Sequence, residues 1–528
     1  MGARDVHFLD TTFRDGLQGQ GLAIESDAMR AVQELDLLGI RYLELGFAMH
    51  EAAGQRIKDA LALGLRAKVA AFGRTHPNDI AAMLGLAKDG LCVAVLVGKS
   101  RRRDALESLH LEPEQNLQHI AESITALKRS GFEVVYDAEH FFDGWLREDR
   151  AYVAETICAA LEGGAGRIVL CDTNGGAMSE DIVTVIQDVA RIVPLEKLGV
   201  HAHDDCGMGV ANSIAAFRAG VDHIQGCLLP RFGERCANAT IAILMPTLVL
   251  KYGVDGELAE NMPRLYQSCR VVADVFNVAI DPKTPYIGDA AFYTEAGMHQ
   301  SGMKRDPGSY LHCNPEAVGN WMRFGLSDQS GKEGVLIKAT ELGIVIPDEL
   351  LPSVMNEYRM VSDAGVEFGI ADASFELFLM RQLGMLPNDL EFIRWRMIVE
   401  KNVDRPVEVE ASLKLIMHRE EEGKDPQKLH DHEGDGPVNA LDGAIRRTLK
   451  NRYPLTLKVK ITDFKVRMVD QGRGSASRVR ALITFSDGSK TWSTLAVHEN
   501  ILEASWEALW DAYLYKIHVI DAEEVLAA

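Results

Sequence analysis

Short apolar runs recur through the first half of the chain, and each is followed by a longer stretch whose apolar residues have helical spacing and which ends at a Gly or Pro. Parallel strands that are buried on both faces have this nearly continuous apolar character. The pattern therefore predicts an α/β fold in which strands alternate with helices. Eight such runs occur, at residues 6–10, 41–47, 68–73, 91–98, 133–139, 167–173, 198–204 and 221–227.

Polar side chains stand at the end of nearly every predicted strand. They are Arg14 and Asp15, Glu44, Arg74, Lys99, Glu139, Asp172 and Thr173, and His201 and His203. In a barrel of eight parallel strands the active site lies at the carboxyl ends of the strands, so catalytic groups form a ring on one face. A doubly wound open sheet is the alternative, but the ring of polar strand ends favours a TIM (β/α)8 barrel over residues 1–285.

The alternation of strands and helices stops near residue 285. A helical, loop-rich region is predicted over 286–418, where helical subdomains would complete the active site. Residues 419–437 are charged and broken by Gly and Pro, which predicts a linker. Helical patterns and period-two strands then alternate over 438–528, which predicts a C-terminal α+β domain. Trp506, Leu509, Trp510 and Tyr513 lie at helical spacing and are expected in its core, with an interface as the alternative.

Composition narrows the class of protein. The 528 residues are 47% hydrophobic and 25% charged, which is typical of a globular protein of several domains. No signal-peptide pattern begins the sequence and no apolar run is long enough to span a membrane, so we expect a cytoplasmic protein without membrane contacts. The eight cysteines form no CxxC pair and are expected as free thiols. A net charge of -21 argues against nucleic-acid binding, although the basic run 99–103 can still meet an anionic cofactor.

The segment HAHDDCG holds the sharpest local signal. His201 and His203 are two residues apart on a predicted strand, so both imidazoles point to the same side and can reach one metal ion. Taken alone, the pair fits a helix cap and a packed histidine equally well. Asp15 adds a carboxylate at the same face of the barrel, and this donor set suits an open divalent-cation site. Arg14 beside it can neutralise a developing oxyanion.

Four other segments carry candidate groups with plain structural alternatives. In GERCANA, Asn238 can supply a neutral oxygen to the metal, although Glu-Arg in a loop is commonly an ion pair. In VVYDAEHFFDG, Glu139 can face the metal beside Tyr136, or the segment can simply cap a helix. In CDTNGG, Thr173 can donate to a substrate carboxylate, or the segment can be a turn. In AGMHQSG, His299 alone would be an exposed loop histidine.

Together these motifs resemble one enzyme family. The segments FRDGLQ, YDAEHFFDG, CDTNGG, HAHDD, GERCANA, TPYIGDAAF, AGMHQSG and NPEAVGN occur in the order found in the 2-isopropylmalate, homocitrate and citramalate synthases. The group also contains hydroxymethylglutaryl-CoA lyase. The tail, with DGPVNALDGAIRRTLKNRYP, resembles the LeuA-type allosteric domain of the synthases, which the lyases lack. YDAEHFFDG and GKS are most similar to the citramalate synthase branch.

The resemblance implies an acyltransferase that converts an acetyl group into an alkyl group on transfer. Its substrates would be acetyl-CoA and a 2-keto acid, most simply pyruvate, which gives (R)-citramalate for isoleucine biosynthesis and releases CoA. The implied cofactor is a divalent metal ion, Mg²⁺ or Mn²⁺, with Zn²⁺ and Co²⁺ as alternatives. The resemblance also implies a homodimer and an amino-acid effector such as isoleucine, bound by the regulatory domain at 438–528.

The resemblance also assigns roles to individual positions. The metal would be bound by Asp15, His201, His203 and Asn238. The 2-keto acid would be surrounded by Arg14, Glu139 and Thr173, with Gln18 and Tyr136 as further substrate contacts. His299, donated across a dimer, would take part in deprotonating acetyl-CoA with Tyr310 nearby.

The chain departs from the family pattern at a few positions that bear on the substrate. Leu228, Pro230 and Arg231 stand where the family usually has a Thr and an Asn-Gly, and Asp204 replaces the usual Asn after the second histidine. Thr294 and Glu295 replace a His-Lys pair, so the acceptor keto acid can differ from pyruvate. Two other functions remain open: a metal-dependent lyase or aldolase, and a non-catalytic effector-binding paralogue.

Overall fold

The structure is a computed structural model that describes residues 5–24, 26–294, 308, 310–324, 332–369, 371–418, 427–469 and 477–522. It divides into two compact units. The first contains residues 1–292 and 311–322, and the second contains 293–310 and 323–528. Glu295 and the whole segment AGMHQSG, which contains His299, lie outside the described residues. Among the described helices, none has the length and apolar character needed to cross a membrane.

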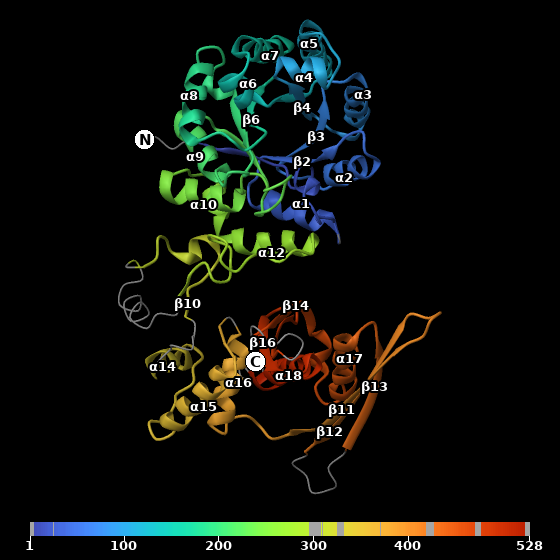
Figure 1. The fold of residues 1–528 in the computed structure, drawn as a ribbon, viewed down its shortest axis with the longest axis vertical. Helices are drawn as coiled ribbons and strands as arrows, with labels where there is room; N and C mark the ends of the chain where they lie inside the picture. The colour runs from blue at the N-terminus through green and yellow to red at the C-terminus, as the bar shows by residue number, and fades with distance from the viewer. Residues whose placement is uncertain are drawn as a thin grey trace. The chain divides into compact units, whose positions relative to one another are not determined.

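The first unit is a closed barrel of eight parallel strands in sequence order, with β8 pairing to β1 (Figure 1). The TIM-barrel prediction is confirmed, and every predicted strand is present. The strands are β1 His7–Asp10, β2 Tyr42–Phe47, β3 Lys68–Arg74, β4 Val93–Lys99, β5 Glu133–Glu139, β6 Arg167–Asp172, β7 Leu198–Ala202 and β8 His223–Gly226.

Helices surround the strands of this unit in Figure 1. Many begin at a recognisable signal; Asp27, for example, accepts a hydrogen bond from the Met29 backbone at the start of α1. The helices are α1 Ala28–Leu37, α2 Glu51–Leu61, α3 Pro77–Leu86, α4 Arg102–Glu107, α5 Pro113–Arg129, α6 Phe141–Arg147, α7 Arg150–Gly163, α8 Ser179–Val189, α9 Gly209–Ala219, α10 Ile241–Tyr252, α11 Glu257–Asn261 and α12 Leu265–Val275.

Two apolar clusters explain why the barrel strands lack a polar face. Val135 belongs to the small cluster inside the barrel, whereas its neighbours Val134 and Tyr136 belong to the large cluster that contains the helices. Successive side chains of a strand point to opposite sides, so both sides of each strand are buried. The inward-pointing series on β5 continues from Val135 to Asp137 and Glu139. The barrel interior is therefore apolar in its middle and becomes polar at the carboxyl ends of the strands.

The second unit contains helices and two antiparallel sheets, which confirms the predicted α+β architecture. One sheet has the order β11-β12-β13 and the other has the order β14-β15-β16, while β9 and β10 form a small parallel pair. The elements are β9 Tyr293–Thr294, β10 Arg323–Phe324, α14 Lys332–Glu341, α15 Leu351–Asp363, α16 Asp372–Gln382, β11 Leu390–Lys401, β12 Val407–Met417, β13 Gln427–Gly434, α17 Pro437–Leu449, β14 Lys460–Met468, β15 Val479–Ser486, β16 Thr491–His498 and α18 Ile501–Tyr515.

The structure shows strands in part of the predicted linker and at the end of the region predicted to be helical and loop-rich, whose earlier part contains the helices α14, α15 and α16. Residues 427–434 form β13, which pairs along its length with β12, and β11 and β12 lie inside the stretch expected to be helical. Helix α17 packs on β12 and β13, so these strands belong to the C-terminal domain. A charged segment favours a linker, but a strand of an antiparallel sheet also carries polar side chains at alternate positions when one of its faces meets water. The charges of β13 are therefore compatible with a strand.

The tryptophan-containing helix α18 lies in the core of the second unit, as predicted. Trp506, Leu509 and Tyr513 are buried, and Trp510 is partly buried against the same cluster. Tyr513 also donates a 2.6 Å hydrogen bond to Asp442 on α17, so the two helices are joined by a buried polar contact as well as by packing. All eight cysteines are free thiols, in line with expectation.

Candidate active site

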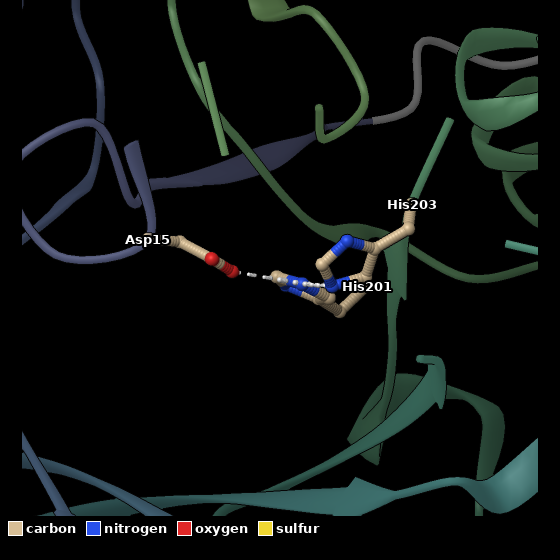
Figure 2. Close-up of side chains that lie close together, drawn as sticks. All are labelled: Asp15, His201 and His203. Atoms are coloured by element: carbon tan, nitrogen blue, oxygen red, sulfur yellow. Dashed lines mark hydrogen bonds and ion pairs between the residues drawn. The ribbon is translucent and has the colours of Figure 1, made fainter. Parts of the chain in front are cut away.

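A carboxylate and two imidazoles converge at the carboxyl-terminal mouth of the barrel. Asp15 lies in the turn after β1, His201 lies on β7, and His203 follows β7 in a bridge with Asn238. Figure 2 shows the Asp15 carboxylate and the His203 ring both directed at His201. The His201 Nε2 atom lies 3.3 Å from Asp15 Oδ2 and 3.2 Å from His203 Nε2. All three residues are buried, and their ligand atoms lie within 4.8 Å of one another.

Arg14 joins this group to a second buried carboxylate. Its guanidinium lies 2.9 Å from Asp15 and 2.6 Å from Glu44 on β2, and it stacks 4.1 Å from the centre of the Phe72 ring. Burial alone would raise the pKa of Asp15, but Arg14 and His201 outweigh it and hold the pKa well below its usual range. Glu44 is affected mainly by burial, which raises its pKa to about 7. Arg14 is thus fixed in place with its positive charge next to the candidate metal ligand Asp15.

The two histidines differ electrostatically although they are neighbours. Burial lowers the pKa of His203 to about 3, with His201 as the next cause. Burial also acts to lower the pKa of His201, but the adjacent Asp15 carboxylate outweighs it and raises the pKa above its ordinary value. A neutral His203 has a free lone pair, which is the state required of a metal ligand.

The group opens into a cavity of about 520 Å³, a volume ordinary for a small-molecule site. Its polar lining contains Arg14, Asp15, His201 and His203, together with Gln18, Asp137, Glu139, Thr173 and Glu234. Its apolar wall contains Phe47, Phe72, Val97, Leu109 and Leu111. Arg74, His76, Lys99 and His119 also line it. The cavity can therefore hold an anionic ligand with a short apolar part.

Two of the predicted substrate contacts, Thr173 and Glu139, have polar partners in the structure. Thr173 Oγ1 accepts a 2.7 Å hydrogen bond from the His140 backbone, so its hydroxyl proton remains available to donate into the cavity. Glu139 forms a 2.5 Å ion pair with Lys99 on the neighbouring strand β4. An acid and a base are thus held side by side at the cavity wall.

Three protein-family models match successive parts of the chain. Residues 5–262 match HMGL-like, residues 286–366 match the homocitrate synthase post-HMGL domain-like model, and residues 369–517 match the LeuA allosteric (dimerisation) domain. The (R)-citramalate synthase of Aquifex aeolicus is 34% identical, and the alignment covers 99% of this chain and 100% of that protein. The (R)-citramalate synthases of Geobacter sulfurreducens and Streptomyces coelicolor are each 36% identical, with 97% and 98% covered in the first case and 96% and 96% in the second.

The chain belongs to the citramalate and isopropylmalate synthase family. It is an acyltransferase of that family, with a LeuA allosteric domain that begins well before the predicted boundary at 438. The buried group Asp15, His201 and His203 is consistent with the divalent-metal site of HMGL-like enzymes.

Not every predicted site residue of this synthase reaches the cavity. Tyr136 is fully buried in the helix-facing cluster, because it alternates with the inward-pointing Val135 and Asp137. Asn238 donates a 2.9 Å hydrogen bond from Nδ2 to Asp15 Oδ2 and is absent from the cavity wall. Tyr310 is exposed and belongs to the second unit. Their proposed roles remain predictions.

Three of the departures from the family pattern, Leu228, Arg231 and Asp204, also do not line the cavity. Leu228 is buried in the outer apolar cluster, while the side chain of Arg231 is 85% exposed. Asp204 turns from the site to accept a 2.7 Å hydrogen bond from the Gly209 backbone at the start of α9. These substitutions therefore leave the described lining of the synthase cavity intact.

The basic run 99–103 is neutralised by acidic neighbours of the same unit. Lys99 pairs with Glu139, and the three arginines pair with Asp104, Asp149 and Glu148. Arg101 is almost completely buried in its ion pair. The run is therefore paired within its own unit. Lys99 also lines the cavity, and an anionic cofactor at this run stays a prediction.

Sequence reasoning missed Gln225, a fully buried residue of β8. Its Oε1 lies 2.9 Å from His201 Nδ1, and its Nε2 donates a 2.8 Å hydrogen bond to Asp137 Oδ1. The available signal was a second polar residue on a short buried strand, on the same side as His223.

Proposed function

We propose that this synthase is an (R)-citramalate synthase, which condenses acetyl-CoA with pyruvate at a divalent metal ion and releases CoA. The buried group of Asp15, His201 and His203, which opens into a small cavity beside Arg14 and Thr173, carries this proposal. The names of the full-length relatives support it, since all three aligned above are called (R)-citramalate synthase. The cavity also has the size expected for a small keto acid and the reacting end of a thioester.

The residues present fit a divalent ion. One carboxylate oxygen and two imidazole nitrogens, already within 4.8 Å of one another, form a three-ligand set that leaves positions for a chelating substrate. When bound there, such an ion supplies Lewis acidity to the keto group of the acceptor. The Oδ1 atom of Asn238 has no hydrogen-bond partner among the described residues, which supports a fourth, weaker contact to the ion.

The chain's own residues would orient and neutralise the acceptor. Arg14, held by Asp15 and Glu44, places a fixed positive charge next to the oxygen that becomes negative as the new bond forms. The free hydroxyl proton of Thr173 can donate to the acceptor carboxylate. Phe72 and Val97 offer an apolar surface to a methyl group.

The reaction needs a proton acceptor and a water molecule. A base removes one proton from the acetyl methyl group, and the resulting carbanion forms a bond to the keto carbon, whose oxygen becomes a hydroxyl after protonation. Water then cleaves the thioester and gives a carboxylate and the free CoA thiol. His299, with Tyr310 nearby, is the proposed base; a dimer would allow one chain to provide it to the barrel of the other.

The LeuA domain supports the proposal of a homodimer with an amino-acid effector. Its family model, which is described as allosteric and dimerising, matches residues 369–517. Isoleucine is the proposed effector, because citramalate leads toward that amino acid.

The deciding experiment measures thiol release from acetyl-CoA with Mg²⁺ or Mn²⁺ across pyruvate, 2-ketobutyrate, 2-ketoisovalerate, glyoxylate, oxaloacetate and 2-ketoglutarate. Release that is fastest with pyruvate, with citramalate as the product, is the expected result. Preference for another acceptor would retain the synthase and replace its substrate. Cleavage of hydroxymethylglutaryl-CoA without any keto-acid activity would instead establish a lyase, and bound metal with neither activity would indicate a non-catalytic effector-binding protein.

A further inference from the structure

Gln225 lies between the candidate metal ligands and a second buried acid. It is completely buried on β8, and its amide bridges His201 Nδ1 at 2.9 Å and Asp137 Oδ1 at 2.8 Å. The amide does not line the cavity, whereas both of its partners do. Gln225 therefore influences the site through the two side chains that it holds.

The two contacts determine which way the amide points. Asp137 offers only acceptor oxygens when ionised, so the NH₂ group of Gln225 must face Asp137 and its oxygen must face His201. The reverse orientation would place the amide oxygen against the carboxylate and the NH₂ group against the ring nitrogen. Asp137 thus fixes the orientation of the Gln225 amide, and the amide oxygen then determines which ring nitrogen of His201 carries the proton.

An acceptor oxygen at His201 Nδ1 requires the ring proton to be on that nitrogen. The lone pair of the neutral ring is then on Nε2, the atom that faces Asp15 Oδ2 at 3.3 Å and His203 Nε2 at 3.2 Å. A metal-binding imidazole is commonly held in this way, by a partner on its other nitrogen. The arrangement places the free lone pair at the point where the three ligand atoms meet.

We propose that Gln225 is a positioning residue for the metal site: fixed by Asp137, it holds His201 in the tautomer and ring orientation that present Nε2 to a divalent ion. This inference rests on the proposed function to the extent that the ion is bound at Asp15, His201 and His203. It adds a residue outside the ligand set and a defined chain of contacts from β5 through β8 to β7.

The test measures Mn²⁺ affinity of the purified, metal-free full chain by calorimetry, which requires no substrate or turnover. Gln225→Met keeps the length of the side chain but removes both hydrogen bonds, and its Kd for Mn²⁺ should rise about 10- to 100-fold, the usual effect of losing such a partner. Gln225→Glu places two carboxylates in contact at positions 137 and 225. We expect a comparable loss, because the repulsion displaces the acceptor from His201.

A second substitution provides the rescue. In Gln225→Glu combined with Asp137→Asn, the new amide at 137 can donate to one oxygen of the new carboxylate, while the other oxygen accepts from His201 Nδ1. The Kd should return to within a few-fold of the value for the unsubstituted chain, since the total charge and the contacts are restored. Circular dichroism and thermal unfolding of each variant confirm that the fold is retained; should the Met variant fail to fold, the single and double charge-swap variants decide.

Each outcome has a clear meaning. A folded Gln225→Met with unchanged affinity, or a double variant that binds no more tightly than Gln225→Glu, would overturn the inference alone. A metal-free native chain that takes up no divalent ion would overturn the proposed function and this inference with it. Weak binding in both single variants and recovery in the double variant would establish the positioning role.

Discussion

At the residue scale, the chemistry of the site was predictable where residues that lie together in space also lie close together in the sequence. His201 lies on β7 and His203 directly follows it, and period-two alternation was enough to place both rings together. The same alternation argues against Tyr136 in the cavity, because its neighbour Asp137 points inward. Gln225 was out of reach for another reason: its role depends on contacts to β5 and β7, and no local pattern specifies the partners of a buried amide.

Removal of one ligand should abolish metal binding and activity together. Asp15→Asn replaces a charged oxygen donor with a neutral amide, and His203→Ala removes one nitrogen, so we expect less than stoichiometric metal and no thiol release from either. Metal content by elemental analysis after gel filtration, alongside the thiol assay, measures both effects. His119→Ala, which removes an imidazole from another part of the cavity wall, is the matched control and should retain its metal. Full metal in either ligand variant would refute the assignment.

Asp10 should make the stability of the barrel depend on pH. Burial raises the pKa of this carboxyl from 3.8 to about 7, so between these values the folded chain keeps a proton that the unfolded chain releases. Raising the pH through this window therefore favours unfolding, by up to about 1.4 kcal/mol per pH unit. Asp10→Asn cannot ionise and should lose less stability between pH 5 and 7. Urea unfolding at several pH values compares the two chains, and parallel curves would contradict the shift.

At the element scale, the barrel strands were predictable and the C-terminal sheets were less so. Each barrel strand is buried on both sides and stands out as an apolar run. By contrast, β13 begins after a segment rich in acidic and basic residues and carries polar groups itself, so its pairing with β12 is visible only in the fold. Sequence alone therefore misplaced the start of the regulatory domain by tens of residues, while the presence of that domain was recognised from the resemblance of its motifs.

The family normally has an asparagine at position 204, in the link between β7 and α9, and this residue should preserve the stability of the chain. Asp204 accepts a hydrogen bond from the Gly209 backbone at the first residue of α9. Asp204→Ala should reduce the free energy of unfolding by about 1 kcal/mol, as is usual for a lost cap, without changing metal affinity. Asp204→Asn keeps an oxygen in place and should unfold almost like the native chain. Thermal unfolding and Mn²⁺ titration of both variants check this, and weaker metal binding by the Ala variant alone would show that Asp204 contributes to the site.

At the scale of the whole molecule, the two units have separate apolar cores. The first core contains the barrel with its helices and residues such as Val318, whereas the second extends from Val335 on α14 to Ile520. Helices α14 to α16 thus share a core with the LeuA domain. Truncation of the chain within residues 419–437 would divide the second core, whereas truncation between the two units would leave both cores whole.

Two truncations test this division. A chain that ends at Met322 keeps both segments of the first unit and should remain folded, monodisperse and able to bind Mn²⁺. A chain that ends at residue 430 loses half of β13 and all of α17, exposes apolar residues of β12 such as Leu413, and should aggregate. Gel filtration and metal titration measure both properties. Aggregation of the shorter chain would show that the barrel depends on the second unit for its solubility.

In the proposed synthase, the metal-type ligands and the residues expected to contact the acceptor's side chain stand on different strands. The metal-type ligands stand after β1 and on or after β7, whereas Phe47, Phe72 and Val97 stand on β2, β3 and β4. Phe72 also stacks on Arg14, so a mutation there would disturb a reacting group. A mutation of Phe47 or Val97 can alter the shape of the acceptor that fits while the metal-type ligands keep their positions. After gene duplication, such a barrel could acquire a new keto acid in single steps without passing through an inactive ancestor.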